Sequence, residues 1–176
     1  MHEIVLGDTT IVSAEATRSQ PQGPSSSVRH EATFVSLAQA GVLAGHRILQ
    51  PTYLPSPSLA LDRVGVLAMP SGPSREVTLT FLRYSETPFQ WLVLHQSPLS
   101  GRGPEHNRRF VSAALREGRI GERPAAIFDH LVPATEAPGG QITITHCLWE
   151  HGRFLMDLQA PHLSLAELTR VGASLA

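Results

Sequence analysis

Alternation of apolar and polar residues in two segments limits the fold of this chain more than any other feature. The two segments are residues 76–84 and residues 141–150. A period of two is typical of strands that have one face against a core and the other facing solvent. Both segments therefore predict strands of an antiparallel sheet. The side chains expected to be buried in them are Val77, Leu79, Phe81, Ile142 and Ile144.

Shorter or less regular segments are expected to supply the other strands. They are residues 4–12, 59–68, 89–96, 125–130 and 153–158. Residues 89–96 follow Ser-Glu-Thr-Pro and are predicted to form a hairpin with residues 76–84. A tight turn at His151-Gly152 is predicted to lead into residues 153–158, because a type I′ turn needs positive φ at both central positions.

Capping signals predict two helices. Ser36 can cap a helix that stops at Gly45, and Gln39 occupies the reciprocal position of a capping box. Ser164 and Glu167 form the same motif at the start of a second helix. This second helix is expected to pack on the sheet through an apolar stripe. Its members are Leu165, Leu168, Val171 and Leu175, of which Leu165 and Leu168 are expected to be buried.

These elements predict an α+β fold in which an antiparallel sheet of about five or six strands packs against two helices. Residues 33–176 are expected to form that single domain. Residues 1–32 are expected to hold an N-terminal strand and a polar stalk or linker, because residues 19–27 are rich in Ser, Pro and Gly. Residues 101–122 are ambiguous, and we favour a short helix or an ordered loop there.

Charge composition argues against a nucleic-acid partner. All 14 basic residues are Arg, 15 residues are acidic, and the formal net charge is −1. Neutralising several phosphates requires a basic surface, which this balance does not predict. The first residues lack the basic-then-apolar order of a signal peptide, and no stretch approaches the roughly 20 apolar residues of a membrane helix. The chain taken alone is therefore expected to be soluble.

The spacing of reactive residues points to no catalytic or metal site. Nine histidines are present, but none form a His-x-x-x-His pair. Cys147 is the single cysteine, and it is expected to face away from His146 because neighbouring residues of a strand point to opposite faces. Gly-x-Ser-x-Gly is absent, and Gly101-Arg102-Gly103 is too short to specify a phosphate loop. We therefore predict no enzyme activity, no catalytic residues, no cofactor and no metal, with the ligand-binding residues unknown.

The order of motifs in the last third of the chain resembles the end of an uncharacterised bacterial domain family. A tryptophan, a glycine turn and an aromatic-x-x-x-leucine strand span residues 149–158, and a helix follows that closes on Ala173-Ser174-Leu175. The Ser36 helix and Pro51-x-Tyr53-Leu54-Pro55 resemble the family's opening. The likeness breaks just after Pro55, where Ser56-Pro57-Ser58-Leu59 replaces the usual glycine and aromatic residue.

Domains of that family form the extracytoplasmic C-terminal part of transmembrane anti-sigma factors, and they also occur beside lipoprotein-carrier-like domains. The resemblance implies a non-enzymatic sensor or regulatory domain, tethered to the cell membrane by an N-terminal helix missing from this chain. It also implies that a sigma factor is bound only by a cytoplasmic domain absent from this chain, and that the partner of this domain is an unknown extracytoplasmic signal or protein. The alternative is a carrier or binding module that holds an apolar ligand or lipid against a curved sheet.

Overall fold

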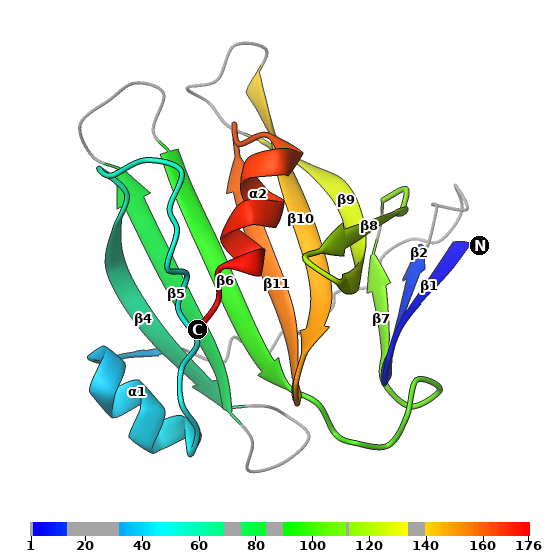
Figure 1. The fold of residues 1–176 in the computed structure, drawn as a ribbon, viewed down its shortest axis with the longest axis horizontal. Coiled ribbons are helices and arrows are strands. Elements are labelled where there is room, and N and C mark those ends of the chain that lie inside the picture. Colours follow the sequence, from blue (N-terminus) through cyan, green and yellow to red (C-terminus); the bar gives the residue numbers. More distant parts are fainter. Residues whose placement is uncertain (1, 14–31, 69–74, 84–89, 112, 134–139) are drawn as a thin grey trace.

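An eight-stranded antiparallel sheet, with strand order β3-β4-β5-β6-β11-β10-β9-β8, forms the centre of the computed structural model (Figure 1). The structure describes residues 2–13, 32–68, 75–83, 90–111, 113–133 and 140–176. In the order of the sheet, the strands are β3 Thr33–Phe34, β4 Ala60–Ala68, β5 Arg75–Arg83, β6 Gln90–Pro98, β11 Phe154–Pro161, β10 Gln141–His151, β9 Arg123–Pro133 and β8 Arg116–Ile120.

A second, three-stranded sheet has the order β1-β2-β7. Its strands are β1 His2–Leu6, β2 Thr9–Ser13 and β7 Arg108–Val111, and β2 and β7 run parallel. Two short helices complete the described elements, α1 Leu37–Ala44 and α2 Leu165–Ala173. Figure 1 shows α2 in front of the large sheet, with the small sheet grouped beyond β8 and β9.

The predicted fold class is wrong. The structure is mostly β, with 58% of it in strands, and its main sheet has eight strands instead of five or six. The region 101–122, predicted as a helix or loop, contains β7 and β8. Gly118 lies in β8, and a Cβ at this position would come within 2.2 Å of the Cδ1 of Ile127 on the neighbouring strand. The alternation rule missed β7 and β8 because both are short and rich in Arg.

The other predicted strands are present. Residues 76–84 and 89–96 correspond to β5 and β6, which form the expected hairpin, although Tyr84 and Phe89 lie outside the described residues. Residues 4–12, predicted as one strand, instead form a hairpin of β1 and β2 with its turn at Gly7 and Asp8. The turn between β10 and β11 comes one residue later than predicted: His151 pairs with Phe154, and Gly152, with φ of 62°, lies in the turn.

Both helix caps are confirmed. The Ser36 hydroxyl accepts a hydrogen bond from the backbone N–H of Gln39, and Gly45 ends α1 in the left-handed region with φ of 71°. Ser164 and Glu167 form the second capping box. The expected burial of Leu165 is wrong, because this first residue of α2 is 42% exposed while the middle of the helix contacts the sheet.

The face of the large sheet that contacts α1 and α2, here termed the helix face, is a packed apolar core. Its fully buried members include Val77, Leu79, Leu92, Leu94, Cys147, Trp149, Met156, Leu158, Leu168 and Val171. Residues 46–59 cover the rest of this face, and Gln96 fixes them there. The Gln96 amide accepts from the Leu49 N–H at 3.0 Å and donates to the Leu49 carbonyl at 2.8 Å. Ala176 pairs with Gln50, and the Arg170 guanidinium lies 3.9 Å from the ring centroid of Tyr53.

The opposite face, here termed the small-sheet face, is covered in part by β1, β2 and β7. A second apolar cluster lies between the two sheets, formed by Ile4, Leu6, Ile11, Val111, Leu115, Ala126, Phe128, Leu148 and Leu155. Ile144 is buried, whereas Ile142, predicted to be buried, is only half-buried. Ile142 lies opposite Val132, and neither residue belongs to one of the two apolar clusters.

Candidate functional site

Ionisable side chains from five strands come together on the small-sheet face. Strand pairing places Asp157 of β11 opposite His95 of β6, and His95 opposite Thr78 of β5. The chain thus collects residues that are far apart in sequence. We term this group the polar row. It consists of Glu76 (β5), His95 (β6), Arg109 (β7), His146 (β10) and Asp157 (β11).

Asp157 is the buried centre of the polar row, with 1% of its side chain exposed. Its carboxylate accepts hydrogen bonds from Arg109 Nη2 at 2.9 Å, from His146 Nδ1 at 3.2 Å and from Gln159 Nε2 at 3.1 Å. Burial alone would raise the pKa of Asp157, but the His146 hydrogen bond and the Arg109 charge together hold this pKa below its ordinary value. Asp157 therefore stays ionised although it is buried.

Glu76 forms the second half of the polar row. It accepts a hydrogen bond from the Ser97 hydroxyl at 2.6 Å, and one of its oxygens lies 3.3 Å from His95 Nδ1. The hydrogen bond with His95 lowers the pKa of Glu76 by more than burial raises it, and the bond from Ser97 lowers it further. The Thr78 hydroxyl also lies 3.0 Å from the same His95 Nδ1.

This geometry bears directly on nucleophilic catalysis. In a hydroxyl–imidazole–carboxylate relay, the hydroxyl contacts one ring nitrogen and the carboxylate contacts the other. Here Thr78 and Glu76 both contact Nδ1 of His95. Ser97 donates directly to Glu76, with no imidazole between them. These contacts fix the orientation of the side chains and do not form the proton relay of an acyl-transfer enzyme.

Aromatic packing holds the His146 ring in place. Phe128 stacks on it with ring centroids 4.5 Å apart and an interplanar angle of 12°, and His130 lies on β9 with its ring centroid 6.2 Å from that of His146. The ring is therefore fixed by stacking and by the hydrogen bond to Asp157. A binding event that moves Phe128 or Arg109 would change the surroundings of the buried carboxylate.

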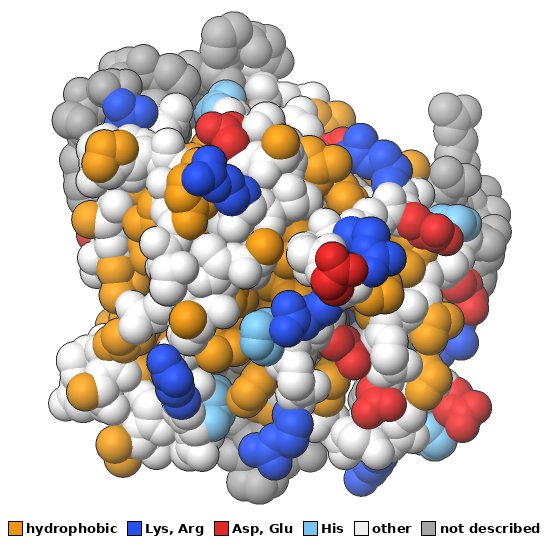
Figure 2. Space-filling model, in the orientation of Figure 1, with side chains coloured by type: hydrophobic (Ala, Val, Ile, Leu, Met, Phe, Trp, Pro, Cys, Tyr) orange, Lys and Arg blue, Asp and Glu red, His pale blue; other side chains and the backbone are white. Residues whose placement is uncertain are grey.

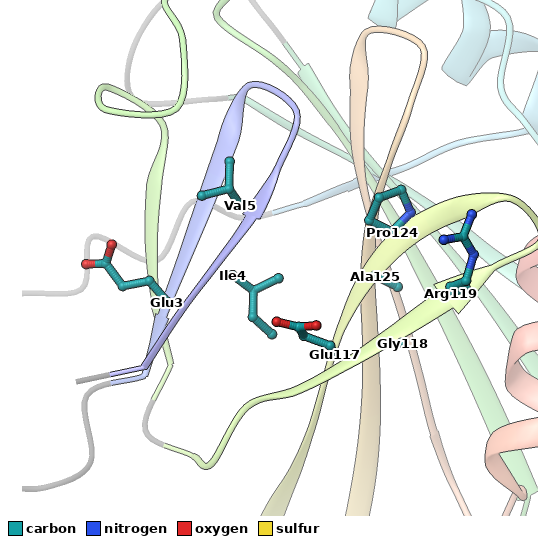
Figure 3. Close-up of a pocket in the computed structure, with 8 residues that line it drawn as sticks. All are labelled: Glu3, Ile4, Val5, Glu117, Gly118, Arg119, Pro124 and Ala125. Carbon is teal, nitrogen blue, oxygen red and sulfur yellow. The ribbon is translucent and has the colours of Figure 1, made fainter.

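A pocket of about 330 Å³ opens beside the polar row. Its walls combine polar row members with the approach to β7, and they include Glu76, Ser97, His106, Asn107, Arg109 and Leu155. Carboxylate, guanidinium and amide groups line this pocket together with the apolar side chains of Pro98, Leu99 and Leu155, and the polar groups suit a ligand that offers both hydrogen-bond donors and acceptors. A larger pocket of about 490 Å³ lies between β1 and β8, where Ile4 and Glu117 extend toward one another (Figure 3).

Cys147 and His146 point to opposite faces, as predicted. Cys147 belongs to the core of the helix face, and burial raises the pKa of its thiol to about 12. The thiol is therefore protonated and shielded at neutral pH. Gly101-Arg102-Gly103 lies in the connection between β6 and β7, with positive φ at both glycines. Within the described ranges, no group of three or more His, Cys, Asp or Glu residues could hold a metal ion.

Sequence reasoning missed the polar row because its members are distributed over five strands. One signal was available in β10, where His146 occupies a position between Ile144 and Leu148 on the same face. A polar residue inside an apolar alternation indicates a buried polar partner. The sequence did not show that the partner would be Asp157, since the register of β10 on β11 places the two residues diagonally.

Acidic and basic side chains are interspersed over the face of the molecule seen in Figure 2. The absence of a nucleic-acid partner stays a prediction. Among the residues that the structure describes, no helix has the length and apolar character needed to cross a membrane. Comparisons of this chain with protein-family models, with curated proteins and with solved structures found no match.

Proposed function

We propose that this chain is a non-enzymatic extracytoplasmic sensor or regulatory domain of a membrane-anchored anti-sigma factor. The order of motifs over residues 33–175 supports this proposal through its resemblance to such domains. The polar row is the structural observation that carries it. Arg109 and His146 contact the buried carboxylate of Asp157, and His95 contacts Glu76 on the adjacent strands, so a charged or polar signal bound in the adjacent pocket, which Glu76 and Arg109 line, would change interactions deep in the sheet.

A catalytic role is less well supported by the same residues. Thr78 and Glu76 share one nitrogen of His95, and the Ser97 hydroxyl is held by Glu76. Cys147 is protonated and buried on the other face. These contacts favour a domain in which ionisable groups hold a conformation and respond to a ligand.

The carrier alternative requires an apolar cavity against the sheet. On the helix face, the space above the strands is filled by large side chains such as Trp149, Leu79 and Leu168, all fully buried. An apolar groove of about 350 Å³ does lie beside α1, lined by Val35, Ala38, Gln39, Val42 and Leu43. Native mass spectrometry of the purified protein distinguishes the two ideas, since a carrier is expected to retain lipid and a sensor of polar signals is not.

The test of the proposed function is transcriptional. Deleting residues 33–176 from the gene in its natural host should change the transcript levels of one coherent set of genes, those controlled by the sequestered sigma factor. Asp157→Asn should change the same set in the same direction. Asp129→Asn is the matched control, because Asp129 is an exposed acid on the neighbouring β9. Unchanged transcription after the deletion would contradict the proposal.

The sequence encoded upstream supplies an independent check. The proposal places the membrane helix and the sigma-binding domain in parts of the protein outside residues 1–176. An upstream coding region with a stretch of about 20 apolar residues is the expected result. An upstream region that encodes no such stretch would argue strongly against a membrane-anchored regulator.

A further inference from the structure

The outer edge of β8 is an unpaired strand edge. Within the described part of the chain, β8 pairs with β9 on one side and with no strand on the other. Glu117 and Arg119 are exposed on this strand, and the pocket of about 490 Å³ lies beside them (Figure 3). A free edge presents backbone N–H and C=O groups that can pair with another strand.

The residue opposite Arg119 shows which backbone groups point outward. Arg119 faces Pro124 of β9, and proline has no N–H to donate. Ile120 and Arg123 close the two-residue turn and so form a hydrogen-bonded pair, which makes Arg119 and Pro124 a non-hydrogen-bonded pair. Because the two kinds of pair alternate, the N–H and C=O groups of both Glu117 and Arg119 point away from β9, toward the free edge.

The charges along this edge are complementary to themselves. If two copies of β8 pair antiparallel about a two-fold axis at Gly118, Glu117 of each copy lies opposite Arg119 of the other. Those are the two residues whose backbone groups point outward, so they would exchange both hydrogen bonds of a pair. Charged edge residues usually prevent strand pairing, but opposite charges placed directly across from one another stabilise it.

The side chains near the axis are compatible with this approach. Glu117 and Arg119 project from the face opposite to Gly118, whose missing side chain leaves room for Ile127 on the helix face. Among the described residues, Glu117 has no ion-pair partner in the monomer, and Arg119 contacts Glu122, whose side chain is fully exposed. Exchange of that surface contact for a cross-strand pair with Glu117 of a second copy therefore breaks no buried interaction.

We propose that this protein forms a two-fold symmetric homodimer through β8, with the two large sheets joined edge to edge into one continuous sheet. The partner is a second copy because the sequence Glu117-Gly118-Arg119 is complementary to itself in the antiparallel direction. An isologous contact of this kind is closed, so it gives a dimer and not a filament.

Sedimentation equilibrium on the whole chain tests the proposal. The parent protein should show a concentration-dependent monomer–dimer equilibrium. Glu117→Arg replaces two attractions per dimer by two repulsions and should weaken dimerisation about tenfold or more. Combining Glu117→Arg with Arg119→Glu restores opposite charges across the axis, and the double variant should return to within a few-fold of the parent.

Glu105→Arg is the matched control, because it makes the same change in net charge at an exposed position outside the strands. It should dimerise like the parent. Circular dichroism confirms that each variant is folded. A parent that remains monomeric at its highest soluble concentration overturns the proposal. So does a dimer that Glu117→Arg leaves unchanged, or one that the double variant fails to restore.

Discussion

The two faces of the large sheet differ in what holds them. The helix face is covered by apolar packing of α2 and residues 46–59 on the strands, and the buried amide of Gln96 is hydrogen-bonded to the backbone of Leu49. The small-sheet face combines apolar packing near β1 with a network of ionisable groups around Asp157. Residues 146–149 of β10 and 155–158 of β11 are therefore buried on both faces of the sheet, but by different kinds of interaction.

This difference separates stability from responsiveness. Apolar packing does not depend on pH or on the charge of a ligand, so the helix face should hold the fold under most conditions. Hydrogen-bonded ion pairs depend on both, so the small-sheet face should be the part that responds. Substitutions on the two faces should accordingly differ in size and in their dependence on pH.

The largest effect is expected on the helix face. Leu168→Ala removes a fully buried side chain from between α2 and the sheet and should lower the free energy of unfolding by about 2–5 kcal/mol. Leu165→Ala is the control, since Leu165 lies on the same helix but is 42% exposed, and it should cost much less. Urea titration measures both. Equal losses in the two variants would mean that α2 is not docked as described.

A somewhat smaller loss is expected at the centre of the polar row. Asp157→Ala leaves the His146 and Arg109 donors without their acceptor and should cost about 2–3 kcal/mol. The expected loss of stability is limited because Arg109 is 40% exposed and can form a hydrogen bond with water instead. Asp129→Ala removes an exposed ion pair with Arg116 and should cost roughly 0–1 kcal/mol. If Asp157→Ala loses no more stability than Asp129→Ala, the polar row is not a network that stabilises the fold.

Low pH should weaken the interactions on the small-sheet face and so lower the stability of the protein. The pKa values of Asp157 and Glu76 are lowered in the folded protein, so the unfolded chain binds protons more readily. Their stabilising contribution is complete above the ordinary carboxyl pKa of about 4 and is lost as the pH falls through the lowered values. The groups facing these carboxylates are His95, Arg109 and His146.

Urea titrations at several acidic pH values check this slope. The parent should lose stability steadily as the pH falls below about 4, and Asp157→Asn should lose less, because one of the two titrating carboxylates is gone. Leu165→Ala should keep the slope of the parent. Identical slopes for Asp157→Asn and the parent would show that folding does not lower the pKa of Asp157.

The smallest effect is expected at a helix cap. Ser164→Ala removes the hydroxyl that accepts from the Glu167 N–H, and with it one half of the capping box. Such a cap contributes about 1 kcal/mol. In thermal melts, the Tm of Ser164→Ala should therefore be well above that of Leu168→Ala. A Ser164 variant as unstable as Leu168→Ala would mean that the cap, and not the apolar stripe, docks α2.

Local signals in the sequence predicted local structure well. The caps at Ser36 and Ser164 are visible because each motif is complete within four residues, and β5 is visible because Val77, Leu79 and Phe81 alternate. The amount of strand structure was underestimated in part because β7 forms a strand by pairing with β2, almost a hundred residues earlier in the chain. No periodicity within four residues indicates such a partner.

The polar row was hidden for the same reason. Glu76, His95 and Asp157 each resemble a solvent-facing residue when seen within their own strands. They become a cluster only through the register of β5 on β6 and of β6 on β11, which depends on long-range pairing. Sequence reasoning correctly separated Cys147 from His146, because that inference needed only the alternation within one strand.

The pairing of β6 with β11, together with the hydrogen bonds between Gln50 and Ala176, has a consequence for how the chain folds. Strands β4, β5 and β6 are consecutive hairpin neighbours and can assemble early from local contacts. β6 can complete its pairing only with β11, a strand more than fifty residues further along the chain. Residues 46–59 can dock only after the residues that follow α2 are in place. Folding should therefore be slow and limited by loop closure. Before β11 pairs with β6, the unpaired edge of β6 is the part of the folding chain most prone to aggregation.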